Sequence, residues 1–118
     1  MKKILVVDDD SAILEVIKVI LEDNNYHVKT SEDGNIKNTV VRFKPDLILL
    51  DLLLSGEDGR DVAKRLKSSS KTSAIPIVML SAHPSAIKAA HESGVNDFIS
   101  KPFDMDYLLE VVARNLGA

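Results

Sequence analysis

Two short apolar runs that each stop at an aspartate are the strongest constraint on how this 118-residue chain can fold. Residues 4–7 (Ile-Leu-Val-Val) run into three consecutive acids that begin at Asp8, and residues 47–50 (Leu-Ile-Leu-Leu) run into Asp51. Uninterrupted apolar runs of this length are typical of strands buried on both faces, as in a parallel sheet covered by helices. The two runs therefore predict buried strands with acids at their carboxyl ends.

The rest of the chain alternates between helix and strand signals. Helical periodicity is expected over residues 11–23, more weakly over 34–43, through Val62 and Leu66, around 86–92 and from Tyr107 to Leu116. Further strands are expected at residues 26–30, 75–80 and 98–100. This order is a βα unit repeated five times. It predicts one α/β domain over residues 1–118, with a doubly wound, five-stranded parallel sheet between two layers of helices.

Composition and charge exclude several classes of function. The net charge of −3 argues against a direct nucleic-acid partner, and the absence of cysteine excludes disulfides, thiolate metal sites and cysteine nucleophiles. The apolar run near the N-terminus holds only four residues, which is too short for a signal peptide or a membrane span. We therefore expect a cytoplasmic protein without a membrane partner.

Chemically useful side chains stand where the predicted strands end. Asp8 and Asp9 follow the first strand, Asp51 the third, Ser81 the fourth and Lys101 the fifth. In an open parallel sheet the ligand site lies outside these carboxyl ends. Carboxylates gathered there repel one another unless a cation is present, and oxygen ligands without His or Cys suit Mg²⁺. A hydroxyl and an ammonium beside the metal predict a site for a phosphoryl group.

This constellation resembles the response-regulator receiver family of two-component signalling, over essentially the whole chain. Five motifs carry the resemblance, in order along the chain: residues 4–9, 45–51, 55–59, 76–82 and 101–103. The resemblance implies the flavodoxin-like strand order 2-1-3-4-5. It also implies a signalling switch that assists its own phosphorylation and dephosphorylation, rather than an enzyme.

The resemblance implies a role for each acid and for the lysine. Asp51 would be the phosphoacceptor, taking the phosphoryl group from a phosphohistidine of a sensor kinase. Mg²⁺ would be held by Asp9, Asp51 and the backbone carbonyl of Leu53, with Asp8 acting largely through water. Lys101 would pair with Asp51 at rest and with the phosphoryl oxygens afterwards.

A second set of residues is implied for switching and for phosphate lifetime. Ser81 would move inward to bond a phosphoryl oxygen, and Phe98 is either a core phenylalanine or a side chain that turns as Ser81 moves. The peptide bond before Pro102 would be cis. Leu53 and His83, two residues past Asp51 and Ser81, would flank the path of the hydrolytic water and tune the phosphate lifetime.

Other interpretations of the same residues remain. Asp10 is expected to cap the first helix rather than to bind metal, and the three histidines are expected on the surface. An aspartate-nucleophile phosphatase of the haloacid dehalogenase type would need a second acid two residues past its nucleophile. If Asp8 were the nucleophile, Asp10 would be that second acid, but the threonine expected in this family is missing. If Asp51 were the nucleophile, the residue two positions later would be Leu53, which is not an acid. A receiver that acts as a scaffold without phosphorylation is the third alternative.

The expected partners follow from the family. They are a sensor histidine kinase or phosphotransfer protein and an output protein or fused effector domain. A second copy could also bind through the face formed by the fourth helix, the fifth strand and the last helix. Both a stand-alone receiver and a part of a longer regulator are compatible with the sequence.

Overall fold

The fold is a five-stranded parallel sheet with helices on both faces. The computed structural model describes residues 1–54, 56–83 and 91–117. The sheet strands are β1 (Lys3–Val7), β2 (His27–Ser31), β3 (Leu47–Asp51), β6 (Ile77–Ser81) and β7 (Asp97–Ser100). They lie in the order β2-β1-β3-β6-β7, and every neighbouring pair is parallel. β4 and β5 belong to a separate hairpin, so β6 and β7 are the fourth and fifth strands of this sheet, and the order is the predicted 2-1-3-4-5.

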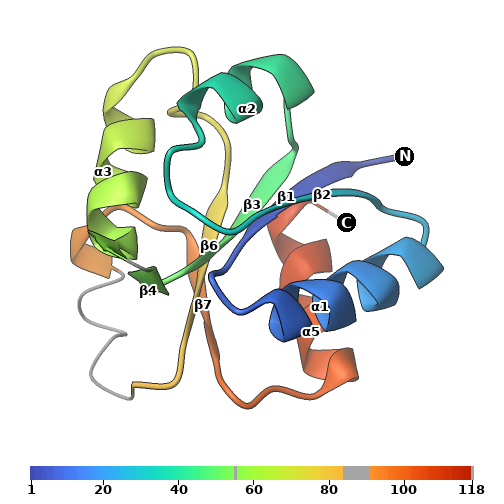
Figure 1. The fold of residues 1–118 in the computed structure, drawn as a ribbon. Coiled ribbons are helices and arrows are strands. Elements are labelled where there is room, and N and C mark those ends of the chain that lie inside the picture. Colours follow the sequence, from blue (N-terminus) through green and yellow to red (C-terminus); the bar gives the residue numbers. More distant parts are fainter. Residues whose placement is uncertain (55, 84–90, 118) are drawn as a thin grey trace.

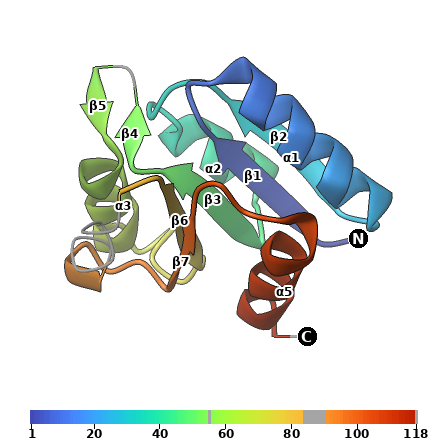
Figure 2. The same cartoon turned by 90° about the horizontal axis from the view of Figure 1, so that it is seen from below.

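Four helices of the described residues cover the sheet. They are α1 (Ser11–Asp23), α2 (Lys37–Phe43), α3 (Gly59–Ser68) and α5 (Met105–Asn115). In two views at right angles, α2 and α3 lie on one side of the sheet, and α1 and α5 lie on the other (Figures 1 and 2). None of these helices is long and apolar enough to cross a membrane.

The alternation of side chains along each strand explains the two layers. Leu5, Leu50 and Met79 point into the core beneath α2 and α3, whereas Val6, Leu49 and Leu80 point into the core beneath α1 and α5. All of them are buried, because both faces of the central strands are covered. This is why the strands read as continuous apolar runs rather than as alternating ones.

Three helices are directly preceded by an aspartate whose side chain accepts hydrogen bonds from amide groups of the first turn. Asp10 caps α1, Asp58 caps α3 and Asp104 caps α5. Such caps satisfy amide groups that have no partner within the helix. The capping role expected for Asp10 is therefore confirmed.

The helix expected over residues 11–23 has the observed bounds, and the other predicted boundaries shift by up to three residues. The weak helix expected over residues 34–43 begins only at Lys37, and the strand expected over 75–80 is β6, Ile77–Ser81. The helix expected around residues 86–92 lies mostly outside the described residues. A small antiparallel hairpin after Asp51 was not predicted: β4 (Leu53–Leu54) pairs with β5 (Glu57–Asp58), and Gly56 lies between them with φ +72°.

Candidate phosphoryl-acceptor site

The expected side chains line one cleft of about 300 Å³ at the carboxyl ends of the strands. β1 delivers Asp8 and Asp9, β3 delivers Asp51, β6 delivers Ser81, and Lys101 follows β7. The cleft is also lined by Asp10, Ile13, Leu53, Ala82 and His83. Phe98 does not line it. That side chain is half-buried and packs against the core beneath α2 and α3.

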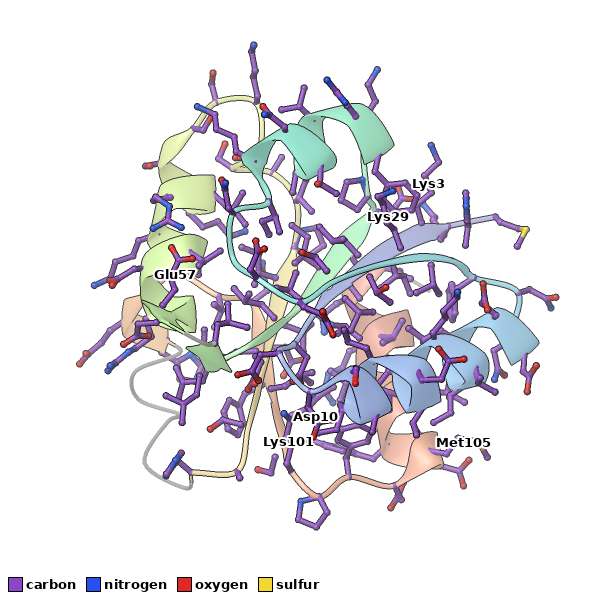
Figure 3. All side chains as sticks on the ribbon, viewed as in Figure 1. Lys3, Asp10, Lys29, Glu57, Lys101 and Met105 are labelled. Carbon is purple, nitrogen blue, oxygen red and sulfur yellow. The ribbon has the colours of Figure 1, made fainter. Side chains whose placement is uncertain are left out.

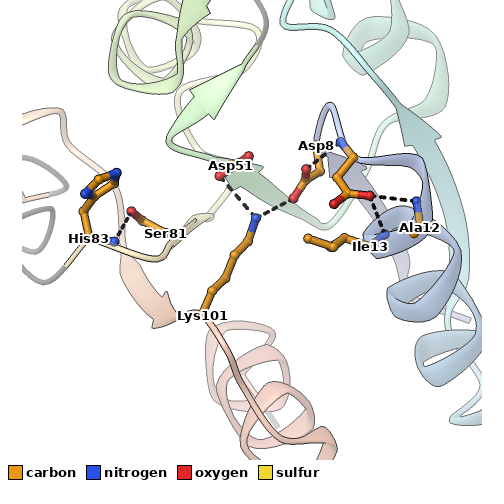
Figure 4. A network of polar contacts seen from close by, with 8 residues as sticks. Asp8, Ala12, Ile13, Asp51, Ser81, His83 and Lys101 are labelled. Atoms are coloured by element: carbon orange, nitrogen blue, oxygen red, sulfur yellow. Dashed lines mark hydrogen bonds and ion pairs between the residues drawn. The ribbon is translucent and has the colours of Figure 1, made fainter.

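Lys101 joins the two buried carboxylates (Figure 4). Its Nζ lies 2.8 Å from Asp8 Oδ2 and 3.5 Å from Asp51 Oδ1. The ammonium therefore bonds more closely to Asp8 than to Asp51, the partner expected at rest. Asp8 also accepts a hydrogen bond from the backbone amide of Asp10 through its other oxygen, at 2.9 Å. Both oxygens of Asp8 are thus engaged within the protein.

Asp51 binds its proton more tightly than a free aspartate side chain does. Burial is the largest cause and the negative charge of Asp8 the next, and together they raise the pKa of Asp51 to about 6. Lys101 and a backbone hydrogen bond from Leu53 act in the opposite direction. Burial alone would lower the pKa of Lys101, but its bonds to Asp8 and Asp51 outweigh burial and raise that pKa. At neutral pH the site therefore holds an ionised Asp51 beside a charged lysine.

The donor set fits a divalent cation that prefers oxygen. One carboxylate oxygen from each of Asp8, Asp9 and Asp51 lies within 4.8 Å of the other two. No His or Cys belongs to this group of ligand atoms, and Mg²⁺ in proteins is commonly bound through one or two carboxylates with water completing the shell. The acid cluster expected from the sequence is thus formed in the fold.

Ser81 and His83 form the far wall of the cleft. Ser81 is almost fully buried, and its Oγ accepts a hydrogen bond of 3.0 Å from the backbone amide of His83. His83 itself is exposed, as are His27 and His91. The expectation of surface histidines is therefore confirmed, and His83 is the one that lines the cleft.

Gly59 packs closely against the backbone of Asp51 and Leu52, and this contact was not predicted from the sequence. A Cβ on Gly59 would lie 2.2 Å from the carbonyl oxygen of Asp51 and 3.0 Å from Cα of Leu52. The amide of Gly59 donates to the carbonyl of Leu52 at 2.7 Å. Gly59 closes the motif at residues 55–59, so the available signal was a glycine at the start of a helix.

The peptide bond between Lys101 and Pro102 is cis, as the resemblance implied.

An apolar groove adjoins the cleft and was also not predicted. It holds about 490 Å³ and shares Ile13, Ala82 and Lys101 with the cleft. Its other lining residues come from α1 and from the segment between β7 and α5: Ala12, Val16, Pro102 and Phe103. Val16 is more than half exposed.

Comparison with known proteins places the chain in a family. The response regulator receiver domain family matches residues 4–113, and the chain belongs to that family. The phosphate regulon transcriptional regulatory protein PhoB of Pseudomonas aeruginosa is 41% identical over 122 residues, covering 98% of this chain and 53% of PhoB. The chain spans about half the length of the curated relatives it matches.

Solved structures give the same result. Chemotaxis protein CheY4 of Vibrio cholerae superimposes with a TM-score of 0.90 at 27% identity, covering 97% of this chain and 98% of that one. The receiver domain of sensor histidine kinase PA1611 of Pseudomonas aeruginosa has a TM-score of 0.86 at 27% identity, covering 99% and 98%. In that structure a magnesium ion is coordinated in the active-site cleft. The chain is thus a receiver domain of the two-component response regulators, whose standard function is to be phosphorylated by a histidine kinase.

Proposed function

We propose that Asp51 is the residue that accepts the phosphoryl group. The observation that carries the proposal is the buried pair of Asp8 and Asp51 joined by Lys101 at the carboxyl ends of the strands. Phosphoryl transfer needs little beyond positioning and charge neutralisation, and this cluster supplies both.

The transfer forms one bond and breaks another. An Asp51 oxygen attacks the phosphorus of a phosphohistidine, and a new P–O bond forms. The P–N bond breaks, and its electron pair returns to the imidazole, which takes up a proton. Because the pKa of Asp51 is about 6, this carboxyl is ionised in most molecules at neutral pH. Its attack on phosphorus therefore needs no general base.

Asp9, Asp51 and the backbone carbonyl of Leu53 would hold Mg²⁺, with Asp8 acting through water because both its oxygens already accept bonds. When bound, the metal offsets the negative charge of the carboxylates and of the phosphoryl oxygens. Lys101 is close enough to Asp51 to turn from the carboxylates to the phosphoryl group. A switch that labels itself in this way differs from a phosphatase, which turns over, and from a scaffold, which is never labelled.

Labelling with acetyl phosphate and Mg²⁺ tests the proposal. We expect the parent protein to form a stable acyl phosphate and Asp51→Asn to form none. Asp10→Asn is the matched control, because asparagine caps a helix as well as aspartate does, and it should label normally. Labelling of Asp51→Asn at the parent level would disprove the assignment.

The apolar groove beside the cleft is the proposed docking surface for the kinase or phosphotransfer protein. It opens next to Lys101 and is lined almost entirely by apolar side chains. Val16→Glu should slow transfer from a phosphohistidine-bearing kinase domain but leave labelling by acetyl phosphate unchanged. Val19→Glu, at a comparably exposed valine of α1 that does not line the groove, is the control. Equal slowing by both variants would contradict this placement.

Ser81 and Phe98 are the proposed route to an output protein, a fused effector or a second copy. The Ser81 Oγ accepts a hydrogen bond from the His83 amide, and the same hydroxyl can donate its proton to a phosphoryl oxygen once Ser81 moves inward. Phe98 lies on β7, two positions before the end of its pairing with β6. Phosphorylation then shifts an existing equilibrium rather than building a new fold. NMR shifts on adding beryllofluoride should extend to Phe98 and α5; shifts confined to the cleft would contradict the switch.

A further inference from the structure

Three surface depressions surround helix α2, and their lining is unlike that of the acidic cleft. They hold about 390, 360 and 410 Å³. Each is lined by two cationic side chains and by no carboxylate. The pairs, in the same order, are Lys37 with Arg65, Lys29 with Arg42, and Lys44 with Lys71.

Most of these cations are not neutralised within the protein. All six side chains are exposed, and within the described part of the chain only Arg65 forms an ion pair, with Glu57. The remaining five define what we call the α2 basic surface: Lys29, Lys37, Arg42, Lys44 and Lys71. Lys3, whose Nζ bonds the carbonyl of Phe43, borders it.

The other side of the molecule has the opposite character. α1 carries Glu15, Glu22 and Asp23 against one lysine, and α5 carries Asp106 and Glu110 against Arg114. Figure 3 shows Lys3 and Lys29 on the side of α2, away from Asp10 and Lys101 at the cleft. In a protein of net charge −3, a long polyanion would be attracted by one side and repelled by the other. A short anionic partner would meet only the basic side.

Apolar side chains lie between the cations. Val41 is 40% exposed. Val41 and Ile75 line the depression that holds Lys44 and Lys71, and Phe43 lines the one that holds Arg42. A phosphate backbone makes no use of such contacts, whereas a polypeptide with alternating acidic and apolar side chains uses both kinds. We propose that the α2 basic surface binds an acidic, partly apolar segment of a partner protein, independently of the phosphoryl-acceptor site.

Binding of defined probes to the full chain tests this proposal. The probes are a fluorescent peptide of alternating glutamate and leucine residues and a short DNA duplex. We expect the peptide to bind more tightly than the duplex, and less tightly as salt rises. Lys37→Gln combined with Arg42→Gln should weaken peptide binding by about tenfold, equivalent to about 1.4 kcal/mol, because two exposed charges are removed.

The matched control removes two cations outside the surface, through Lys18→Gln on α1 and Lys64→Gln on α3. It lowers the net charge by the same amount and should change peptide binding less than about twofold. Thermal melting shows whether both double variants are folded. Equal weakening by the two double variants, absence of peptide binding, or tighter binding of the duplex would each overturn the proposal.

Discussion

The acidic cleft and the α2 basic surface both gather charge, but only the cleft buries it. Asp8 and Asp51 are buried and share Lys101, so burial and mutual repulsion raise the pKa of Asp51 to about 6. Around α2 the charged ends lie in water, where exposed pairs contribute little. Charge that the fold removes from solvent thus has a shifted pKa, whereas charge at the surface acts through long-range attraction, the role proposed above for the cations around α2.

The largest effect should come from the metal ligands of the cleft. Asp9→Asn should lower the rate of labelling by acetyl phosphate about a hundredfold or more, equivalent to about 2.7 kcal/mol, because it removes one of three carboxylates that gather within 4.8 Å. Excess chelator should do the same to the parent. Arg42→Gln, on the α2 basic surface, should leave the rate unchanged. Full labelling in chelator would show that charge neutralisation does not depend on a metal.

The backbone beneath Asp51 gives the next effect. Gly59→Ala should lower the free energy of unfolding by about 2 kcal/mol, since overpacking of a tight site costs between about 1 and 3 kcal/mol and its Cβ would lie 2.2 Å from the Asp51 carbonyl oxygen. Gly56→Asn is the comparison, because nothing lies within 4 Å of that position and asparagine tolerates its positive φ. Urea unfolding measures both. Equal stabilities for the two variants would mean that the contact below Asp51 relaxes freely.

The raised pKa of Asp51 predicts a dependence of stability on pH in the absence of divalent cations. The folded protein holds this proton up to about pH 6, whereas a free aspartate side chain loses it near a pKa of 3.8. The contribution of Asp51 to stability is therefore present at low pH and lost as pH rises through 6. Asp51→Asn should be more stable than the parent above pH 6, by an amount on the order of 2 kcal/mol, and the difference should vanish near pH 4. A constant difference across this range would refute the shift.

Phosphate lifetime should change more modestly. Leu53 lines the cleft and is 54% exposed, and it offers no group that orients water. Leu53→Asn should shorten the lifetime of the acyl phosphate by about fivefold, near 1 kcal/mol in the barrier. Decay of label after removal of the donor measures it. An unchanged or longer lifetime would assign the control of water to another residue, His83 being the nearest candidate.

The smallest effect should come from an exposed ion pair near α2. Arg65 pairs with Glu57 at the surface, and both side chains remain partly in water. Arg65→Gln should cost less than about 0.5 kcal/mol of stability, as measured by urea unfolding. If Arg65→Gln lowered the free energy of unfolding as much as Gly59→Ala does, exposed and buried contacts would contribute equally to stability, which would contradict this account.

How far the sequence predicts this molecule depends on how locally each feature is encoded. The strands before Asp8 and Asp51 follow from apolar runs, and the parallel sheet follows from alternation with helices. The order of the strands was implied by the resemblance to the receiver family. The cap at Asp10 follows from residue type. The β4–β5 hairpin was missed because two-residue strands have no periodicity.

Features that depend on tertiary packing were predicted least well. The closeness of Lys101 to Asp8 depends on how β1 and the segment after β7 approach each other, 93 residues apart in the chain. The basic surface was missed because its cations are scattered between Lys29 and Lys71 and only the fold brings them around one helix.

The most direct test of the central claim is to locate the phosphoryl group chemically in the unaltered protein. After labelling with acetyl phosphate, sodium borohydride reduces an aspartyl phosphate to homoserine, and mass spectrometry of the peptides identifies the converted residue. The buried cluster of Asp8, Asp51 and Lys101 predicts homoserine at position 51 alone. Homoserine at position 8 or 9, or a label that resists borohydride, would contradict the account.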